Sequence, residues 1–136
     1  MAKAYIVKGK ESRVEYGHPW IFRSDISHTE GDITPGDVVD VYSSKKKFLG
    51  RGFYNPQSQI TIRMLTYEHE EINHEFLYNR IKDAWNYRKQ VADINSCRAV
   101  FAESDFLPAL IVDKFSDILV VQTLALGIDR FKREIV

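Results

Sequence analysis

The spacing of apolar residues first changes near residues 66–72, and that change constrains the fold more than any other feature. Before it, residues 59–65 alternate apolar and polar side chains, which is the pattern of a half-buried strand. After it, apolar residues recur at helical spacing between Ile72 and Ala92. The sequence therefore predicts a β-rich front region, a helix from about Asn73 to Ala92, and a further region behind that helix.

Short strands separated by turn residues are expected throughout the front region. β-branched and aromatic residues favour strands at 4–8, 38–42 and 48–54. Residues 10–16 are expected to form one helical turn, and the polar stretch 27–34 is expected to be a loop. Gly50 and Gly52 inside a strand indicate a bulge or a bend. Several short strands with regular turns predict a small barrel or sandwich.

The region behind the helix is expected to contain a short strand at 98–101 and a hairpin formed by 109–112 and 118–124. Residues 127–136 have helical spacing and reach the last residue without a capping signal, so we expect a truncated chain. An incomplete sheet leaves an edge with unpaired backbone groups. We therefore expect self-association through residues 95–136.

Charge and composition narrow the class of protein only a little. The chain has 19 basic and 19 acidic residues; residues 1–67 hold 10 basic and 7 acidic ones, and the rest hold 9 and 12. A positive front and a negative back favour modules with different partners. One cysteine, no secretory signal and no apolar run of about 20 residues predict a cytoplasmic protein that does not enter a membrane.

Catalytic and metal-binding patterns are weak. Methyl transfer on a class I fold needs a glycine-rich turn between a strand and a helix, and Gly50-Arg51-Gly52 does not open a helix. Cys97 has no nearby histidine and is expected to be a core residue rather than a nucleophile. The four histidines lack the spacing of a zinc site. We therefore expect no catalytic, cofactor-binding or metal-binding residue in this chain, and the acidic residues Glu103, Asp105 and Asp113 are read as solvated acids of a loop and a hairpin edge.

Four segments together resemble a known family. Gly17-His18-Pro19-Trp20-Ile21-Phe22, Pro35-Gly36-Asp37-Val38-Val39, residues 48–56 and residues 60–65 resemble the PUA domain of bacterial 23S ribosomal RNA cytosine-5 methyltransferases. Residues 103–113 resemble the next module of that family, the EEHEE domain, with Ala109 where glycine is expected. The resemblance implies an α+β fold, with a small PUA-like β-barrel at 1–70, a bridging helix at 71–94 and a partial β-β-α module at 95–136.

The same resemblance implies a function. The parent enzyme would use S-adenosylmethionine to methylate a cytosine in 23S ribosomal RNA, with its catalytic domain outside this chain, so the chain alone is expected to be inactive. Its front region would bind structured RNA, because basic side chains engage phosphates and aromatic planes stack on unpaired bases. Two alternatives stay open: a free-standing RNA-binding or accessory protein, and a protein-interaction module. The expected RNA contacts combine basic and aromatic residues of the front region: Lys10, Arg13, His18, Trp20, Arg23, Lys45, Lys46, Lys47 and Arg51.

Overall fold

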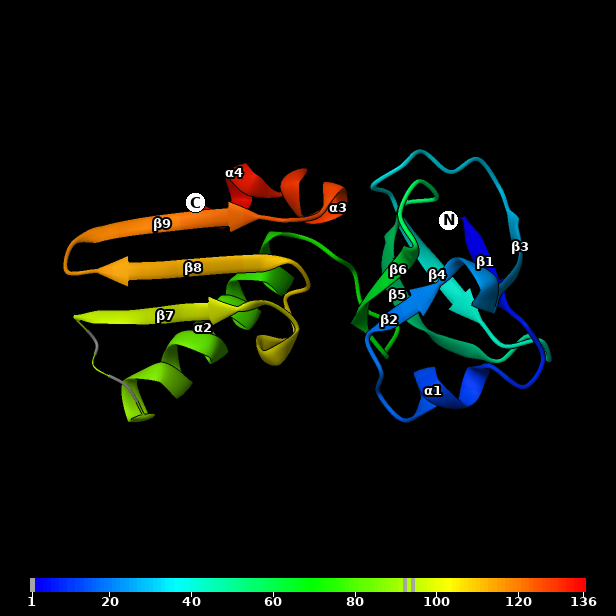
Figure 1. Cartoon of the computed structure of the whole chain (residues 1–136), viewed down its shortest axis with the longest axis horizontal. Helices are drawn as coiled ribbons and strands as arrows, with labels where there is room; N and C mark the ends of the chain where they lie inside the picture. The colour runs from blue at the N-terminus through cyan, green and yellow to red at the C-terminus, as the bar shows by residue number, and fades with distance from the viewer. Residues whose placement is uncertain (1, 92, 94) are drawn as a thin grey trace. The chain divides into compact units, whose positions relative to one another are not determined.

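The chain folds into two compact units, Met1–Glu70 and Glu71–Val136 (Figure 1). The structure is a computed structural model that describes residues 2–91, 93 and 95–136. Each unit has its own sheet, and each is described separately below. The mixed α and β architecture expected from the sequence is confirmed.

The first unit is a six-stranded sheet with one short helix. Its strands lie in the order β2-β6-β5-β4-β1-β3. β1 runs parallel to β4, while every other neighbouring pair is antiparallel. The elements in chain order are β1 (Lys3–Ile6), α1 (Glu11–Glu15), β2 (Trp20–Phe22), the 3-10 turn η1 (Arg23–Asp25), β3 (Ile26–Glu30), β4 (Val38–Tyr42), β5 (Phe48–Tyr54) and β6 (Ile60–Thr66).

The sheet of the first unit curls around an apolar core (Figure 1). The strand predicted at residues 59–65 is present as β6, but it is buried on both faces rather than half-buried, since Thr61 and Leu65 are buried as well as Ile62 and Met64. The helix α1 contributes Val14, which is almost fully buried. Burial of these side chains is the main force that holds the unit together. The core consists of Ala4, Ile6, Val14, Ile21, Val39, Val41, Leu49, Ile62 and Met64.

The bulge predicted at Gly50 and Gly52 is confirmed. The pairing between β4 and β5 shifts register near Gly50, and the pairing between β5 and β6 shifts between Arg51 and Gly52. Gly50 has φ +152°, and a Cβ there would overlap the carbonyl oxygen of Thr66. A Cβ on Gly52 would lie 2.5 Å from the carbonyl oxygen of Arg63. Glycine is therefore required where β5 and β6 approach most closely, and the bulges bend the sheet.

The loop predicted at 27–34 is partly wrong, because Ile26–Glu30 forms the edge strand β3. β3 pairs with β1 through its backbone, and four of its five side chains are exposed. An edge strand with two solvated faces needs no apolar alternation, so its polar sequence concealed it. Residues 34–37 after β3 form a tight turn, in which the Asp37 N–H donates to the Thr34 carbonyl at 2.9 Å.

The second unit is a three-stranded antiparallel sheet, β7-β8-β9, with helix α2 against one face. The predicted helix is confirmed as α2 (His74–Val91), and the Asn73 side chain accepts the Phe76 N–H at 2.9 Å as its N-cap. Ala92, its predicted last residue, lies outside the described residues. The other elements are β7 (Ser96–Phe101), η2 (Ala102–Asp105), β8 (Leu110–Phe115), β9 (Ile118–Thr123), α3 (Leu126–Asp129) and α4 (Lys132–Ile135).

The helix that was expected to bridge two modules belongs to the second unit. Ile81 and Trp85 of α2 line a small apolar cavity of about 250 Å³ together with Val100, Val112 and Leu119 of the sheet. Leu77 is almost fully buried, and Ala84 is also buried. The helix therefore builds this unit's core rather than acting only as a connection.

The single helix predicted at 127–136 is wrong in detail. The segment forms two short helices, α3 and α4, which break at Arg130 and Phe131. The Thr123 hydroxyl at the end of β9 lies 2.6 Å from the Asp129 carboxylate and ties α3 to the sheet. Ile128 is fully buried, so the apolar spacing of this segment did identify a core position.

Candidate nucleic-acid interface

The helix α1 and the loop after it carry four of the residues predicted to contact RNA. Lys10 is exposed at the start of α1. The Arg13 guanidinium is also exposed, 3.8 Å from the Asp25 carboxylate and 3.3 Å from His18 Nε2. These contacts orient Arg13 without burying it, so it stays accessible to a phosphate.

His18 and Trp20 form a small ordered pair behind Arg13. The Trp20 backbone N–H donates to His18 Nδ1 at 3.2 Å, and the two rings meet edge-on with centroids 6.5 Å apart. The Arg63 guanidinium lies 5.6 Å from the Trp20 ring centroid. Trp20 is half-buried, so it supports the surface and is neither a full core residue nor a freely exposed platform.

The tip of the β4–β5 hairpin presents the three consecutive lysines. Lys45, Lys46 and Lys47 are all exposed. The turn is closed because the Ser43 N–H donates to the Lys47 carbonyl at 2.8 Å and the Lys47 N–H donates to Ser43 Oγ at 3.1 Å. Three ammonium groups on one rigid turn make a concentrated positive patch, which attracts a polyanion.

Two predicted contacts have structural partners. Arg51 Nε donates to the Asp40 carboxylate at 2.7 Å, and its Nη1 donates to the Glu70 carbonyl. Both side chains of the Arg51–Asp40 ion pair are largely buried. Arg23 is exposed, but its Nη2 donates to the Pro56 carbonyl at 2.9 Å. We leave Arg51 out of the proposed interface because its hydrogen bonds hold β4, β5 and the end of the unit together.

A groove that the sequence prediction missed lies between the end of α1 and the β4–β5 hairpin. It has a volume of about 600 Å³ and is lined by Glu15, Tyr16, Gly17, Lys47, Phe48, Leu49 and Tyr67. Tyr16 is 92% exposed, and Tyr67 is 40% exposed. Burial of the remaining part of Tyr67 raises its pKa above 10.0, so its phenol stays neutral. The sequence signal that could have indicated this groove is Tyr16, which stands directly before Gly17 at the end of a one-turn helix.

Phe48 in this groove belongs to a row of five contacting rings that crosses the sheet. His28 stacks on Tyr5 with centroids 4.5 Å apart, and Tyr5 stacks on Tyr42 at 5.6 Å. Tyr42 meets Phe48 edge-on at 5.7 Å, and Phe48 stacks on His69 at 3.6 Å. Burial and then the neighbouring Glu30 carboxylate raise the pKa of Tyr5. The row links strands β3, β1, β4 and β5, so it fixes the orientation of the Phe48 ring.

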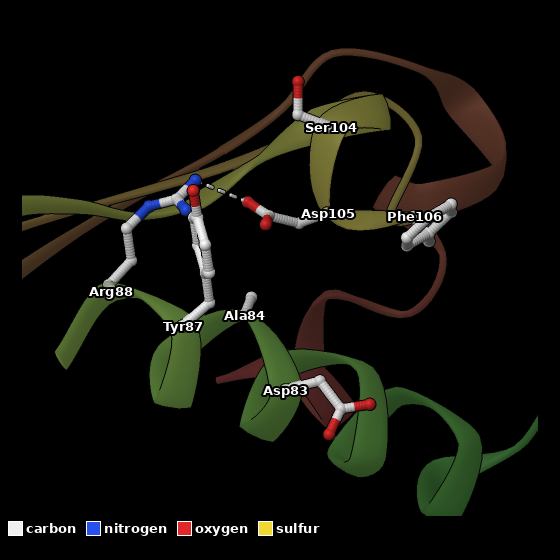
Figure 2. A pocket seen from close by; sticks show the side chains of 7 residues that line it. All are labelled: Asp83, Ala84, Tyr87, Arg88, Ser104, Asp105 and Phe106. Carbon is white, nitrogen blue, oxygen red and sulfur yellow. Dashed lines mark hydrogen bonds and ion pairs between the residues drawn. The ribbon is translucent and has the colours of Figure 1, made fainter. Parts of the chain in front are cut away.

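The second unit has an open pocket of about 480 Å³, whose lining side chains are drawn in Figure 2. At its floor Arg88 donates to the Asp105 carboxylate at 2.8 Å, and both side chains are largely buried. Asp105 also accepts the Phe101 N–H at 2.6 Å, and Arg88 donates to the Arg98 carbonyl at 2.7 Å. The charges of Arg88 and Asp105 are therefore used to join α2 to β7 and η2. The lining residues are Asp83, Ala84, Tyr87, Arg88, Ser104, Asp105 and Phe106.

The other acidic and metal-ligating candidates do not come together. Asp113 pairs with Arg98 at 2.7 Å, which raises the pKa of that guanidinium. Cys97 is a half-buried free thiol on β7. Within the described residues, no three histidine, cysteine or carboxylate side chains gather around a point that could hold a metal ion. In the same part of the chain, no helix is long and apolar enough to cross a membrane.

Comparison with known proteins defines the class of the first unit. Residues 5–67 match the family model described as a PUA-like domain, a range that includes α1, the basic hairpin and the groove. The curled sheet, the short helix and this match together define the first unit as a PUA-like domain. The fold class predicted from the sequence is thereby confirmed.

The chain as a whole is similar to proteins named ribosomal RNA large subunit methyltransferase I. It is 38% identical over 135 residues to the one from Vibrio cholerae serotype O1, covering 97% of this chain and 34% of that protein. The one from Serratia proteamaculans is 36% identical over 129 residues, covering 92% of this chain and 33% of that protein. The chain therefore spans about a third of the length of the curated relatives that it matches.

Solved structures show the same fold. A putative SAM-dependent methyltransferase from Streptococcus mutans aligns with a TM-score of 0.85 and 17% identity, covering 99% of this chain and 36% of that one. A putative methyltransferase complexed with SAH aligns equally well, with a TM-score of 0.85 and 16% identity, covering 99% and 36%. At these identities the likeness establishes the fold alone.

Proposed function

We propose that the PUA-like unit binds structured RNA, and that this chain is the RNA-recognising part of an S-adenosylmethionine-dependent methyltransferase acting on a cytosine of 23S ribosomal RNA. The observation that carries the RNA-binding proposal is the patch of three exposed lysines on a closed hairpin turn, of which Lys47 lines a groove together with the end of α1. The names of the relatives support ribosomal RNA as the partner.

The basic residues of the unit would contact phosphates and fix the position of the RNA. The ammonium groups of Lys45, Lys46 and Lys47 and the guanidinium of Arg13 are accessible, and such contacts release counterions from the RNA. Lys10 and Arg23 would extend the patch on the same unit. His18 and Trp20 would shape the surface beside Arg13. The basic side chains would thus supply affinity for RNA, and the ordered rings of His18 and Trp20 would determine how the RNA lies on the surface.

A salt titration tests this proposal. The full chain and a variant with Lys45, Lys46 and Lys47 changed to glutamine are titrated with a labelled RNA stem-loop by fluorescence anisotropy at increasing salt. If the three lysines contact phosphates, the slope of log K against log salt falls by about 2 to 3 in the variant. A matched control changes Lys89, Lys132 and Arg133, which are exposed residues of the second unit. Equal slopes for wild type and the lysine variant would overturn the proposal.

The methyl-transfer part of the proposal is tested separately. We propose that the cofactor site lies outside residues 1–136, so calorimetry of this chain with S-adenosylmethionine is expected to give no heat of binding. Tight binding would contradict that assignment. A free-standing RNA-binding protein without methyl transfer would have the same interface, so RNA binding does not separate it from part of a methyltransferase. A methylation assay separates them, because a longer protein that contains this chain would methylate 23S ribosomal RNA only if the chain is part of the methyltransferase.

A further inference from the structure

The groove between α1 and the β4–β5 hairpin holds more aromatic surface than phosphate binding needs. Tyr16, Phe48 and Tyr67 all line it, and Tyr16 is 92% exposed. A single exposed ring is common on protein surfaces, but three aromatic rings that line one groove beside charged residues form a patch of the kind that binds partners. Within the described residues, the Tyr16 side chain makes no hydrogen bond and no ring contact. The Tyr16 ring can therefore contact a ligand, whereas Tyr5, Tyr42 and Phe48 of the same unit already contact other rings.

The wall opposite Tyr16 is rigid. Phe48 is stacked on His69 at 3.6 Å with an interplanar angle of 18°, and Tyr42 meets it edge-on. The Phe48 backbone sits at the start of β5, where it pairs with Tyr42. A ligand that enters the groove thus meets one exposed ring, Tyr16, and one ring that is held by its neighbours, Phe48.

The charges at the groove select among flat ligands. Lys47 lines it directly, Lys45 and Lys46 lie beside Lys47 on the same turn, and Glu15 is the acidic residue of the lining. Three positive charges against one negative charge favour a ligand that combines a flat ring with an anion. A nucleotide is such a ligand, because its base has an aromatic face and its phosphate is an anion. A base inside a helix stays stacked on its neighbours, so only an unpaired one can enter.

We propose that this groove takes one unpaired nucleotide of the bound RNA, with the base stacked on Tyr16 against the Phe48 wall and the adjoining phosphate on Lys47. The inference rests on the proposed RNA binding and adds to it a preference for RNA with an unpaired base. The neutral Tyr67 phenol at the groove supplies a hydrogen-bonding group for the base edge. The lysines then give affinity for any structured RNA, and Tyr16 gives discrimination.

The test compares two RNAs with the full chain. One is a duplex of about 14 base pairs, and the other is the same duplex with one unpaired adenosine at its centre. Stacking on an aromatic side chain contributes about 1–3 kcal/mol per base, so we expect the bulged duplex to bind about tenfold more tightly. Tyr16→Ala is expected to abolish this preference without changing the salt slope, and Tyr16→Trp is expected to keep it. The matched control is Tyr78→Ala, which removes an exposed tyrosine of α2.

A spectroscopic readout separates stacking from indirect effects. With 2-aminopurine at the unpaired position, stacking on Tyr16 is expected to quench its fluorescence on binding, and Tyr16→Ala is expected to remove that quenching. Equal affinity for the two duplexes, or a preference that survives in Tyr16→Ala, would overturn the inference. If both duplexes bind equally with a lysine-dependent salt slope, the inference alone fails. If neither duplex binds, the proposed function fails with it.

Discussion

The two units differ in what they leave exposed. The first unit curls its sheet around a core, and its surface shows lysines, arginines and isolated rings. The second unit covers one sheet face with α2 but leaves apolar side chains on the other, including Phe101, Phe115, Ile118 and Val120, which are 41% to 60% exposed. The surface of the first unit favours contact with a polyanion, and the exposed apolar face of the second unit favours burial against another apolar surface.

Net charge does not distinguish the units, although a division after residue 67 gave a positive front region and a negative back region. With the boundary at Glu70, residues 1–70 hold 10 basic and 9 acidic residues, and residues 71–136 hold 9 and 10, so the net charges are +1 and −1. The difference lies in clustering, because three lysines share one turn in the first unit. A phosphate backbone interacts with the local charge density of the protein surface rather than with the net charge of the unit.

The largest expected effect tests whether the two units unfold separately. Ile62 in the first unit and Leu110 in the second are both fully buried, so changing either to alanine should cost about 2–5 kcal/mol. Each unit has one tryptophan, Trp20 or Trp85, so urea unfolding of single-tryptophan variants reports each unit by fluorescence. Each alanine variant is expected to shift only its own unit's transition. A shift of both transitions by either change would show that the units form one cooperative body.

Arg51 tests whether a cation of the first unit stabilises the fold or contacts RNA. Removing a largely buried charge from its hydrogen bonds leaves Asp40 unpaired, so Arg51→Ala is expected to destabilise the first unit by about 2 kcal/mol. Under conditions where the variant stays folded, its salt slope for RNA should equal that of wild type. A slope reduced by about 1 would mean that Arg51 contacts a phosphate after all.

The edge strand β9 of the second unit tests self-association, which remains a proposal. No charged residue occurs between Ile118 and Ile128, so nothing on β9 opposes pairing with a second copy. Val120 is 41% exposed, whereas Val121 is half-buried, so Val120→Lys is the less disruptive change. We expect it to weaken association at least about tenfold in sedimentation experiments. The corresponding change on the first unit's exposed edge, Thr29→Lys, should have no effect. A wild-type chain that is monomeric at high concentration would contradict this proposal.

Ala109 carries the smallest predicted effect. Its φ is +63°, a left-handed conformation that costs an alanine about 1 kcal/mol and glycine almost nothing. Glycine also raises the entropy of the unfolded chain, so Ala109→Gly should stabilise the second unit by only about 0.5 kcal/mol. Thermal unfolding followed through Trp85 measures the change. Destabilisation would show that the buried Ala109 methyl group matters more than the backbone strain.

Periodicity predicted the parts of the fold that bury apolar residues. The alternation at residues 59–65 predicted β6, although the strand is buried on both faces, and the helical spacing after Ile72 predicted α2, which packs one face on a core. It failed for β3, whose exposed side chains carry no pattern, and for the break between α3 and α4. The expected glycine at Ala109 did mark a left-handed backbone position.

The candidate site was only partly predictable for a different reason. Consecutive lysines are visible in the sequence, so the hairpin patch was found. The groove joins Tyr16, Phe48 and Tyr67 from three separate segments, and such a juxtaposition depends on the folded chain. The role of Arg51 also depended on folding, since its partner Asp40 lies on the neighbouring strand. Residue type alone could not separate an arginine that contacts RNA from one that holds a sheet together.

The most direct test of the account locates RNA on the full chain by hydrogen exchange with mass spectrometry. With a structured RNA stem-loop at saturating concentration, we predict that protection appears at residues 10–20 and 43–49, the segments that carry α1, the loop after it and the lysine turn. Residues 96–123, which form the sheet of the second unit, are predicted to exchange as in the free chain. Protection confined to residues 96–123 would contradict the assignment of RNA binding to the PUA-like unit.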